Sequence, residues 1–212
     1  AIAEGVMKRL GQESESLRFP EPITLDEVRA LEPKAAFILP SKNFQGALEV
    51  LDEKKKSIAL ATRTSPVSDA IIGYKGPTDT LMLLSPDGKT LRGIRIRKSF
   101  ETKRYLAYVT GDDYFMHLFD GKSVDHLAGI DFEKEKIEGV SGATQTSWAV
   151  AEGLKQKSAH VLKDFRERVP AYAKIRWRWQ DAGHLLVILS AFVMAFTPLR
   201  GSGKARLIHH LF

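Results

Sequence analysis

Cysteine is absent from this sequence of 212 residues. The chain therefore has no disulfide, no thiolate zinc site, no cysteine-ligated iron–sulfur cluster and no cysteine nucleophile. The chain also has little net charge, with a formal value of +6. Apolar residues make up 43% of the chain and charged residues 27%. This composition supports a buried hydrophobic core and excludes a disordered polymer.

The positive charge is confined to one part of the chain. Residues 1–147 are nearly neutral, with 21 basic and 22 acidic side chains, whereas residues 148–180 carry 8 basic and 3 acidic side chains. A nucleic-acid-binding domain usually spreads basic side chains over one face of its folded body. Here they lie beside an apolar run, which indicates a membrane boundary and argues against nucleic acid as a partner.

The apolar run covers residues 182–199 and contains no charged side chain. At about 1.5 Å per residue, a helix of this length spans roughly 27 Å, close to the hydrocarbon thickness of a bilayer. Trp177 and Trp179 precede the run and Arg200 follows it, as at the borders of a membrane helix. We expect a transmembrane helix here, and a helix buried in a soluble core is the alternative.

The sequence divides into four parts on this reading. Residues 1–20 form a polar tether, and residues 21–172 form the folded domain. Residues 173–200 hold the juxtamembrane segment and the transmembrane helix. Residues 201–212 follow the membrane and read as the start of a further element.

The folded domain is predicted to be α+β, with a mostly antiparallel sheet and packed helices. The clearest hairpin joins residues 80–84 and 90–97 through the turn Pro86-Asp87-Gly88. Side chains alternate along residues 94–97, which predicts one buried and one solvated face. Thr24 and Glu27 form a capping box, and residues 145–169 show the pattern of a long amphipathic helix. Three short apolar runs predict further strands, at residues 35–39, 47–51 and 57–62.

The stretch from Glu138 to Ser147 is the most informative part of the sequence. It is a loop of small and hydroxylated residues that leads into the long helix. The first turn of a helix leaves backbone N–H groups unpaired, and the helix dipole favours an anion there. Gly142 and Ala143 allow close approach to the backbone, and Ser141 adds a hydroxyl donor. The stretch is a candidate phosphate site, and an ordinary Ser/Thr N-cap is the alternative.

This stretch resembles the flavinylation motif of FMN-binding domains, in which an acidic residue precedes Gly-x-Ser/Thr-Gly-Ala-Thr-x-Thr/Ser. The resemblance implies that FMN is attached through a phosphoester to Thr144. It also implies contacts from Ser141, Gly142, Ala143 and Thr146.

A second region agrees with the same family. The run Gly73-Tyr74-Lys75-Gly76-Pro77 and the pair Glu101-Thr102 look like parts of the domain's core, whereas residues 103–105 replace the family's Pro-Gly-Leu loop. The resemblance implies that Tyr74, Gly76, Glu101 and Thr102 also line the cofactor site. For Tyr74, stacking on the flavin and simple core packing both remain open.

The order of the parts is similar to the NosR/NirI group of membrane flavoproteins. That resemblance implies a bacterial inner-membrane protein whose flavin domain lies on the periplasmic side. The chain would transfer electrons within a membrane redox complex and have no substrate turnover of its own. Its partners would be other subunits or domains of that complex and an FAD-dependent flavin transferase. The alternative is a structural or regulatory subunit that keeps the fold without redox turnover.

Other candidate sites are weaker, and no metal site is predicted. Asp112 and Asp113 could serve a soluble hydrolase, although they read better as a helix start. Adjacent histidines at 209 and 210 would point to different faces of a helix, and His117 and His126 read as surface residues. The cations of the long helix are predicted to form its solvated face: Lys155, Lys157, Lys163, Arg166 and Arg168.

Overall fold

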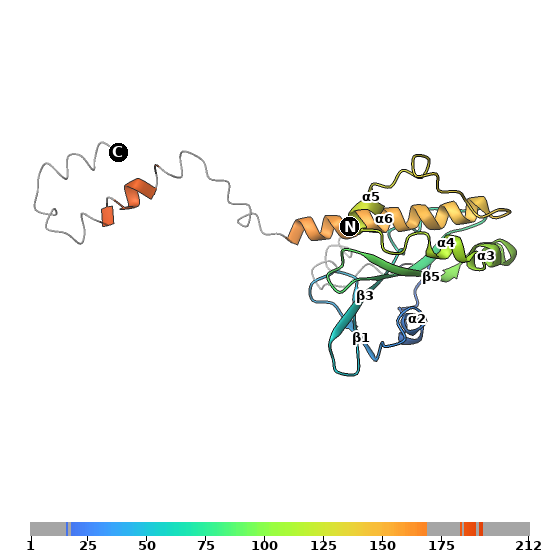
Figure 1. Ribbon diagram of the computed structural model, residues 1–212, viewed down its shortest axis with the longest axis horizontal. Coiled ribbons are helices and arrows are strands. Elements are labelled where there is room, and N and C mark those ends of the chain that lie inside the picture. Colours follow the sequence, from blue (N-terminus) through green and yellow to red (C-terminus); the bar gives the residue numbers. More distant parts are fainter. Residues whose placement is uncertain (1–15, 17, 169–182, 184, 190, 193–212) are drawn as a thin grey trace, which may run out of the picture. The chain divides into compact units, whose positions relative to one another are not determined.

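The computed structural model describes residues 16, 18–168, 183, 185–189 and 191–192 (Figure 1). The chain divides into two units, residues 1–168 and residues 169–212, which are treated separately below. The elements of the first unit, in chain order, are α2 (Leu25–Arg29), β1 (Phe37–Pro40), β2 (Leu48–Leu51), β3 (Ser57–Arg63), β4 (Thr78–Leu84), β5 (Leu91–Ser99), α3 (Lys103–Thr110), α4 (Asp113–His117), α5 (Val124–Ala128) and α6 (Thr144–Arg168).

The five strands form one antiparallel sheet in the order β1-β2-β3-β4-β5, so each strand pairs with the next one along the chain. The predicted hairpin is confirmed as β4 and β5. Its turn is closed by the Gly88 N–H, which donates to the Ser85 carbonyl at 2.8 Å, and Gly88 has a φ of +71°. The α+β fold class with an antiparallel sheet is therefore confirmed.

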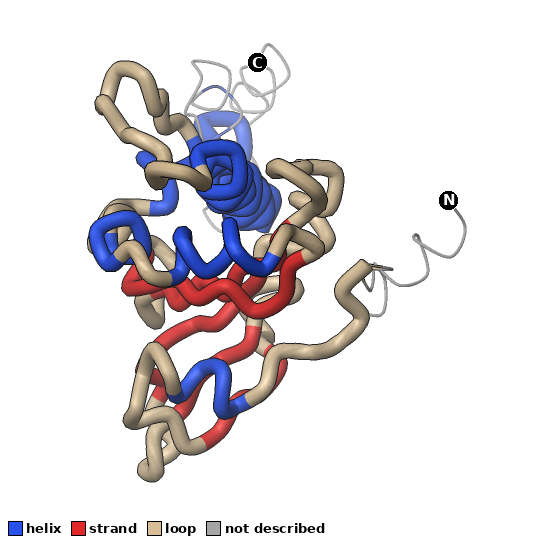
Figure 2. Tube along the Cα trace, turned by 90° about the vertical axis from the view of Figure 1, so that its right-hand side faces the viewer, coloured by secondary structure: helices blue, strands red, loops and turns tan. Residues whose placement is uncertain are grey.

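Helices cover both faces of the sheet, and each face has its own core (Figure 2). The larger core joins the sheet to α4, α5 and α6 through side chains such as Met82, Phe119 and Leu154. The smaller core lies on the opposite face, where Val28 of α2 packs with Ala61 and Leu81. Alternate residues of one strand thus point into different cores, which is the two-residue period of a β-strand.

The capping box of α2 is confirmed. The Glu27 N–H donates to the Thr24 hydroxyl, and the Thr24 N–H donates back to the Glu27 carboxylate. The predicted solvated face of residues 94–97 is wrong at Arg97, whose side chain is only 1% exposed. Arg97 is buried because it pairs with Asp79 at 2.7 Å and with Glu27 at 3.0 Å beneath the segment that leads into α2.

The long helix is confirmed as α6, and it begins at Thr144 itself. The prediction that Lys157 lies on the solvated face is wrong, because this side chain is 1% exposed. Lys157 follows Val150, Gly153 and Leu154 at helical spacing, and all three are buried. The lysine therefore belongs to the face of α6 that packs on the domain.

The segment before α2 is partly packed against the domain. The Ser16 hydroxyl donates to the Asp69 carboxylate at 2.5 Å, and the Phe19 ring lies 5.3 Å from the Phe100 ring. Among the described residues of this segment, Ser16 and Phe19 thus contact the domain.

In the second unit, most of the predicted transmembrane segment at 182–199 lies outside the described residues. The residues that are described there, 183, 185–189 and 191–192, are helical. Within the described part of the chain, no helix is both long enough and apolar enough to cross a membrane.

Candidate functional site

The stretch from Glu138 to Ser147 contains a loop that leads into α6, called the motif loop below. This loop folds back onto the first turn of α6. The Val140 N–H donates to the Ser147 hydroxyl at 2.9 Å, and that hydroxyl donates to the Thr144 carbonyl at 2.9 Å. Between them, the Ala143 N–H donates to the Val140 carbonyl at 2.9 Å, and Gly142 has a φ of +76° that only glycine adopts readily. Ser147 therefore fixes the loop to the helix start, which leaves Thr144 at a defined place.

Thr144 is the first residue of α6, and it is exposed. Its hydroxyl donates to the Val140 carbonyl at a long 3.3 Å. The backbone of Gly139 lies against it, since a Cβ on Gly139 would come within 2.8 Å of Thr144 Cγ2 and of Trp148 Nε1. Ser141 and Gly142 are also exposed, whereas Ala143 is buried. The loop thus presents one anchored threonine and an open backbone to solvent.

A second loop, residues 73–76, packs against the same helix turn. A Cβ on Gly73 would clash with Glu101 Oε1 and would lie 3.2 Å from Thr146 Cα. The Glu101 carboxylate is 7% exposed, and each of its oxygens accepts from the Lys75 N–H at 3.2 Å. Gly76 contacts the backbone beside it, because its Cβ would lie 2.5 Å from Phe100 Cβ. Glu101 therefore fixes the shape of the loop next to the motif.

Thr146 carries an unsatisfied polar atom. The residue is 0% exposed, and its Oγ1 has no hydrogen-bond partner among the described residues. An unpaired buried hydroxyl costs about 1–3 kcal/mol. The Thr146 Cα lies 3.2 Å from the position of a Cβ on Gly73, in the helix turn that begins at Thr144.

Aromatic side chains lie around the two loops. Tyr74 is 59% exposed, so simple core packing is wrong for it, and its ring lies edge-on to the Tyr105 ring at 4.8 Å. The Tyr108 ring lies against Gly142, with two ring carbons 3.6 and 3.7 Å from the position of a Cβ there. Trp148 is partly exposed and packs edge-on to Phe132 at 5.2 Å. These partly open rings offer a surface for a planar ligand.

Helix α3 brings polar groups to the same region. Thr102 is its N-cap, but the Thr102 side chain makes no capping hydrogen bond. Arg104 is exposed, and its Nε–H donates to the Tyr108 hydroxyl at 2.8 Å. Sequence reasoning missed this helix and the contributions of Gly139, Tyr105 and Tyr108. The spacing of the two tyrosines, three residues apart, was the available signal for a shared helix face.

The structure does not bring the other candidate residues, the aspartates at 112–113 and the described histidines, together into a site. The Asp112 carboxylate accepts from the Phe115 N–H at 2.9 Å and caps α4, as the helix-start reading predicted. His117 is exposed, and its hydrogen bond to Asp120 raises the pKa of the imidazole. His126 pairs with Glu135 at 3.0 Å. The described residues contain no group of three or more side chains that could hold a metal ion, and the pair at 209–210 lies outside them.

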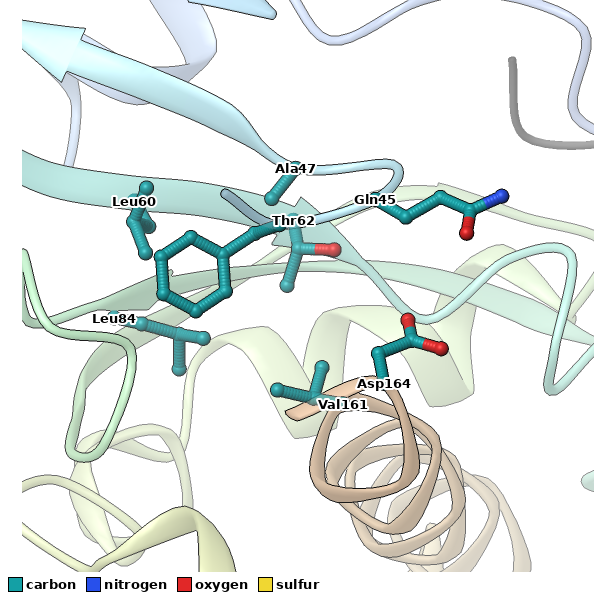
Figure 3. A pocket seen from close by; sticks show the side chains of 8 residues that line it. Gln45, Ala47, Leu60, Thr62, Leu84, Val161 and Asp164 are labelled. Atoms are coloured by element: carbon teal, nitrogen blue, oxygen red, sulfur yellow. The ribbon is translucent and has the colours of Figure 1, made fainter. Parts of the chain in front are cut away.

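A separate pocket lies near the other end of α6 (Figure 3). Its walls are mostly apolar, and Gln45, Thr62 and Asp164 supply the polar groups. The residues that line it are Phe44, Gln45, Ala47, Leu60, Thr62, Leu84, Val161 and Asp164. None of the predicted cofactor residues belongs to this set, so the pocket is distinct from the motif loop.

Comparison with known proteins gives a family match for part of the chain. Residues 73–157 match the FMN-binding domain family. All of the predicted cofactor residues, from Tyr74 to Thr146, lie inside the matched range, and the match supports FMN as the ligand.

The crystal structure of NqrC from Shewanella oneidensis is similar at 15% identity, with a TM-score of 0.36, over 68% of this chain and 72% of that one. Comparison with curated protein sequences gave no match. The function proposed below therefore rests on the FMN-binding match and on the geometry of the site.

Proposed function

We propose that this chain is a membrane-anchored flavoprotein that carries FMN on Thr144 and passes electrons within a membrane redox complex. The FMN-binding match over residues 73–157 supports the cofactor. The observation that carries the attachment site is that Thr144, an exposed residue with a hydroxyl, is the first residue of a 25-residue helix and follows the glycine turn at Gly142.

The residues around this helix start suit a phosphate group. The unpaired N–H groups of a helix's first turn and its dipole favour an anion. The positive φ at Gly142 leaves the loop backbone open, and the buried Thr146 hydroxyl has no partner among the described residues. A larger residue at Gly139 would displace Thr144 or Trp148. The site is therefore shaped for a group that approaches the backbone closely and accepts hydrogen bonds.

The attachment chemistry needs a second protein. A phosphoester forms when the Thr144 oxygen attacks the FMN phosphorus of FAD, the pyrophosphate bond breaks, and AMP leaves. The threonine proton must pass to a base. Within the described residues, the hydrogen-bond partner of the Thr144 hydroxyl is the Val140 carbonyl, which is not a base. We therefore assign the base and any metal to a separate FAD-dependent flavin transferase.

The chain itself supplies position, and the flavin supplies the redox chemistry. A flavin accepts one or two electrons and so links one-electron to two-electron carriers. The Tyr108 ring lies against Gly142 of the motif, and the loop that carries Tyr74 is held by Glu101 and packs at Thr146, so both offer surfaces near the motif. No residue is assigned a catalytic role.

The anchor is proposed to be the helix over residues 182–199. Its described residues are helical, and five large apolar side chains among them are half or more exposed: Leu185, Leu186, Ile188, Leu189 and Phe192. A helix with exposed apolar side chains is more stable in lipid than in water. We further propose that the anchor lies in the bacterial inner membrane with the flavin domain on its periplasmic side, the arrangement that the NosR/NirI resemblance implies.

Two matched variants test the attachment. Thr144→Val keeps the shape of the side chain and removes the nucleophile, whereas Thr146→Val removes the buried neighbouring hydroxyl. After co-expression with a flavin transferase, we expect Thr144→Val to lose the fluorescent gel band and the added mass of one FMN less water. Thr146→Val should keep both. Peptide mass mapping over residues 137–155 locates the modification.

Two outcomes would contradict this proposal. Modification retained in Thr144→Val would place the flavin elsewhere. A wild-type protein that stays unmodified and binds no flavin would favour the reading as a structural subunit.

A further inference from the structure

A tyrosine holds the guanidinium of Arg104 beside the motif loop. The Arg104 Nε–H donates to the Tyr108 hydroxyl at 2.8 Å, and the Arg104 Cζ lies 5.5 Å from the centre of that ring. The Tyr108 ring in turn lies against Gly142, two residues before Thr144. Arg104 is thus positioned by a side chain that contacts the loop leading into the attachment residue.

Most of the donor capacity of Arg104 is left for a ligand. A guanidinium carries five N–H donors in a planar fork, and one of them is used by Tyr108. Across the part of the chain that the structure describes, no carboxylate forms an ion pair with Arg104, and the side chain is exposed. The hydrogen bond and the nearby Tyr108 raise the pKa of the Arg104 guanidinium, so the cation is retained.

We propose that Arg104 binds the phosphate of FMN and that Tyr108 is its positioning residue; this inference rests on the proposed function of the motif loop. The backbone N–H groups and hydroxyls of the loop are neutral donors. Arg104 adds a full charge and a planar fork that matches two phosphate oxygens at once. Arg104 and Tyr108 both belong to α3, the helix over residues 103–110.

The test separates phosphate binding from ring binding. FMN and riboflavin carry the same ring, but only FMN carries a phosphate. The full-length chain, produced without a flavin transferase and purified in detergent, is titrated with each compound, and the quenching of flavin fluorescence gives the two dissociation constants. The variants are Arg104→Gln, Arg104→Lys and Tyr108→Phe. The matched control is Arg95→Gln, which removes the same charge from an exposed arginine on β5.

We expect wild type to bind FMN more tightly than riboflavin. Arg104→Gln should weaken FMN binding about tenfold and leave riboflavin binding unchanged, because a tenfold change is the size expected for one charge-assisted contact. Arg104→Lys and Tyr108→Phe should each weaken FMN binding by roughly threefold, since one loses the fork and the other its anchor. Arg95→Gln should change neither constant.

Three results would overturn the inference. Equal losses for FMN and riboflavin in Arg104→Gln would show a structural role for the Arg104–Tyr108 pair. An unchanged FMN constant would show that Arg104 does not reach the phosphate, while the flavin site itself stands. A wild-type chain that binds neither compound would remove this inference, whereas the proposed function would still be decided by whether a flavin transferase modifies Thr144.

Discussion

At the residue scale, Gly139 constrains where Thr144, the proposed attachment residue, lies. Its Cβ position is 2.8 Å from Thr144 Cγ2 and 2.8 Å from Trp148 Nε1, so Gly139→Ala forces both side chains, or the backbone of residue 139, to move. We expect Gly139→Ala to destabilise the domain by about 1–3 kcal/mol and to lower flavin attachment at Thr144. Denaturant unfolding and intact mass measure the two effects.

Gly129→Ala is the control for this variant. A Cβ there meets nothing closer than 3.9 Å, so both readouts should stay near wild type. Normal flavin attachment in Gly139→Ala would show that the loop tolerates a displaced Thr144.

Glu27 gives the fold a defined dependence on pH. Burial acts to raise the pKa of Glu27, but the Thr24 N–H bond and the bond and charge of Arg97 outweigh it and hold this pKa below its usual 4.5. An acid whose pKa is lowered by folding stabilises the fold above its unfolded pKa, and this contribution is lost as the pH falls through the folded pKa. Glu27→Gln should therefore be less stable than wild type at pH 7.

The difference in the free energy of unfolding between wild type and Glu27→Gln should disappear as the pH falls below about 4. Free energies of unfolding from urea titrations at several pH values check this. A gap that persists unchanged at pH 3 would show that the loss comes from packing and not from ionisation.

At the element scale, Arg97 ties β5 to β4 and to the segment before α2. Its guanidinium contacts the Asp79 and Glu27 carboxylates, and Nη2 donates to the Pro22 carbonyl at 2.7 Å. The Asp79 side chain is 0% exposed, and Arg97→Met would leave that carboxylate with only Arg63 at 3.6 Å as an ionic partner and the Ser65 N–H at 3.2 Å as a neutral donor. We expect a loss of about 3–5 kcal/mol, the usual cost of breaking a buried pair from one side.

Urea unfolding followed by circular dichroism measures this loss. Arg95→Met, on the same strand but exposed, should change stability by less than about 0.5 kcal/mol. A loss below 1 kcal/mol for Arg97→Met would mean that the ion network adds little to the fold.

The sequence predicted the elements whose signals are local. The Pro86-Asp87-Gly88 turn, the Thr24 capping box and the helix after Ala143 are each specified by a few adjacent residues, and all three are confirmed. The burial of Arg97 and Lys157 could not be predicted from adjacent residues. It depends on which elements pack over β5 and α6, which is a property of the tertiary structure.

The candidate site also has a part that adjacent residues specify and a part that only the fold assembles. The motif around Thr144 is contiguous in sequence and could be found there. Its neighbours come from distant positions: the Glu101 carboxylate holds the loop at Lys75, and the Tyr108 ring covers Gly142. Short helices such as α3 carry weak patterns, because one or two turns hold too few residues to show a period.

At the scale of the whole molecule, the boundary at Arg168 separates two kinds of surface. The first unit, residues 1–168, contains both cores and every predicted cofactor residue. The described side chains of the second unit are mainly apolar and exposed. The proposed flavin binding and the proposed membrane attachment should therefore be separable by cutting the chain at this boundary.

We expect a fragment that ends after Arg168 to stay in the supernatant after lysis and to accept FMN from a flavin transferase, because both cores formed by the described residues lie within residues 1–168. The full chain should sediment with membranes and resist an alkaline carbonate wash, because a helix over residues 182–199 would bury its apolar surface in lipid. As a control, adding residues 169–212 to an unrelated soluble protein should carry that protein to the membrane. Release of the intact full chain by carbonate would contradict the anchor, whereas an insoluble fragment would show that the flavin domain depends on the second unit to fold.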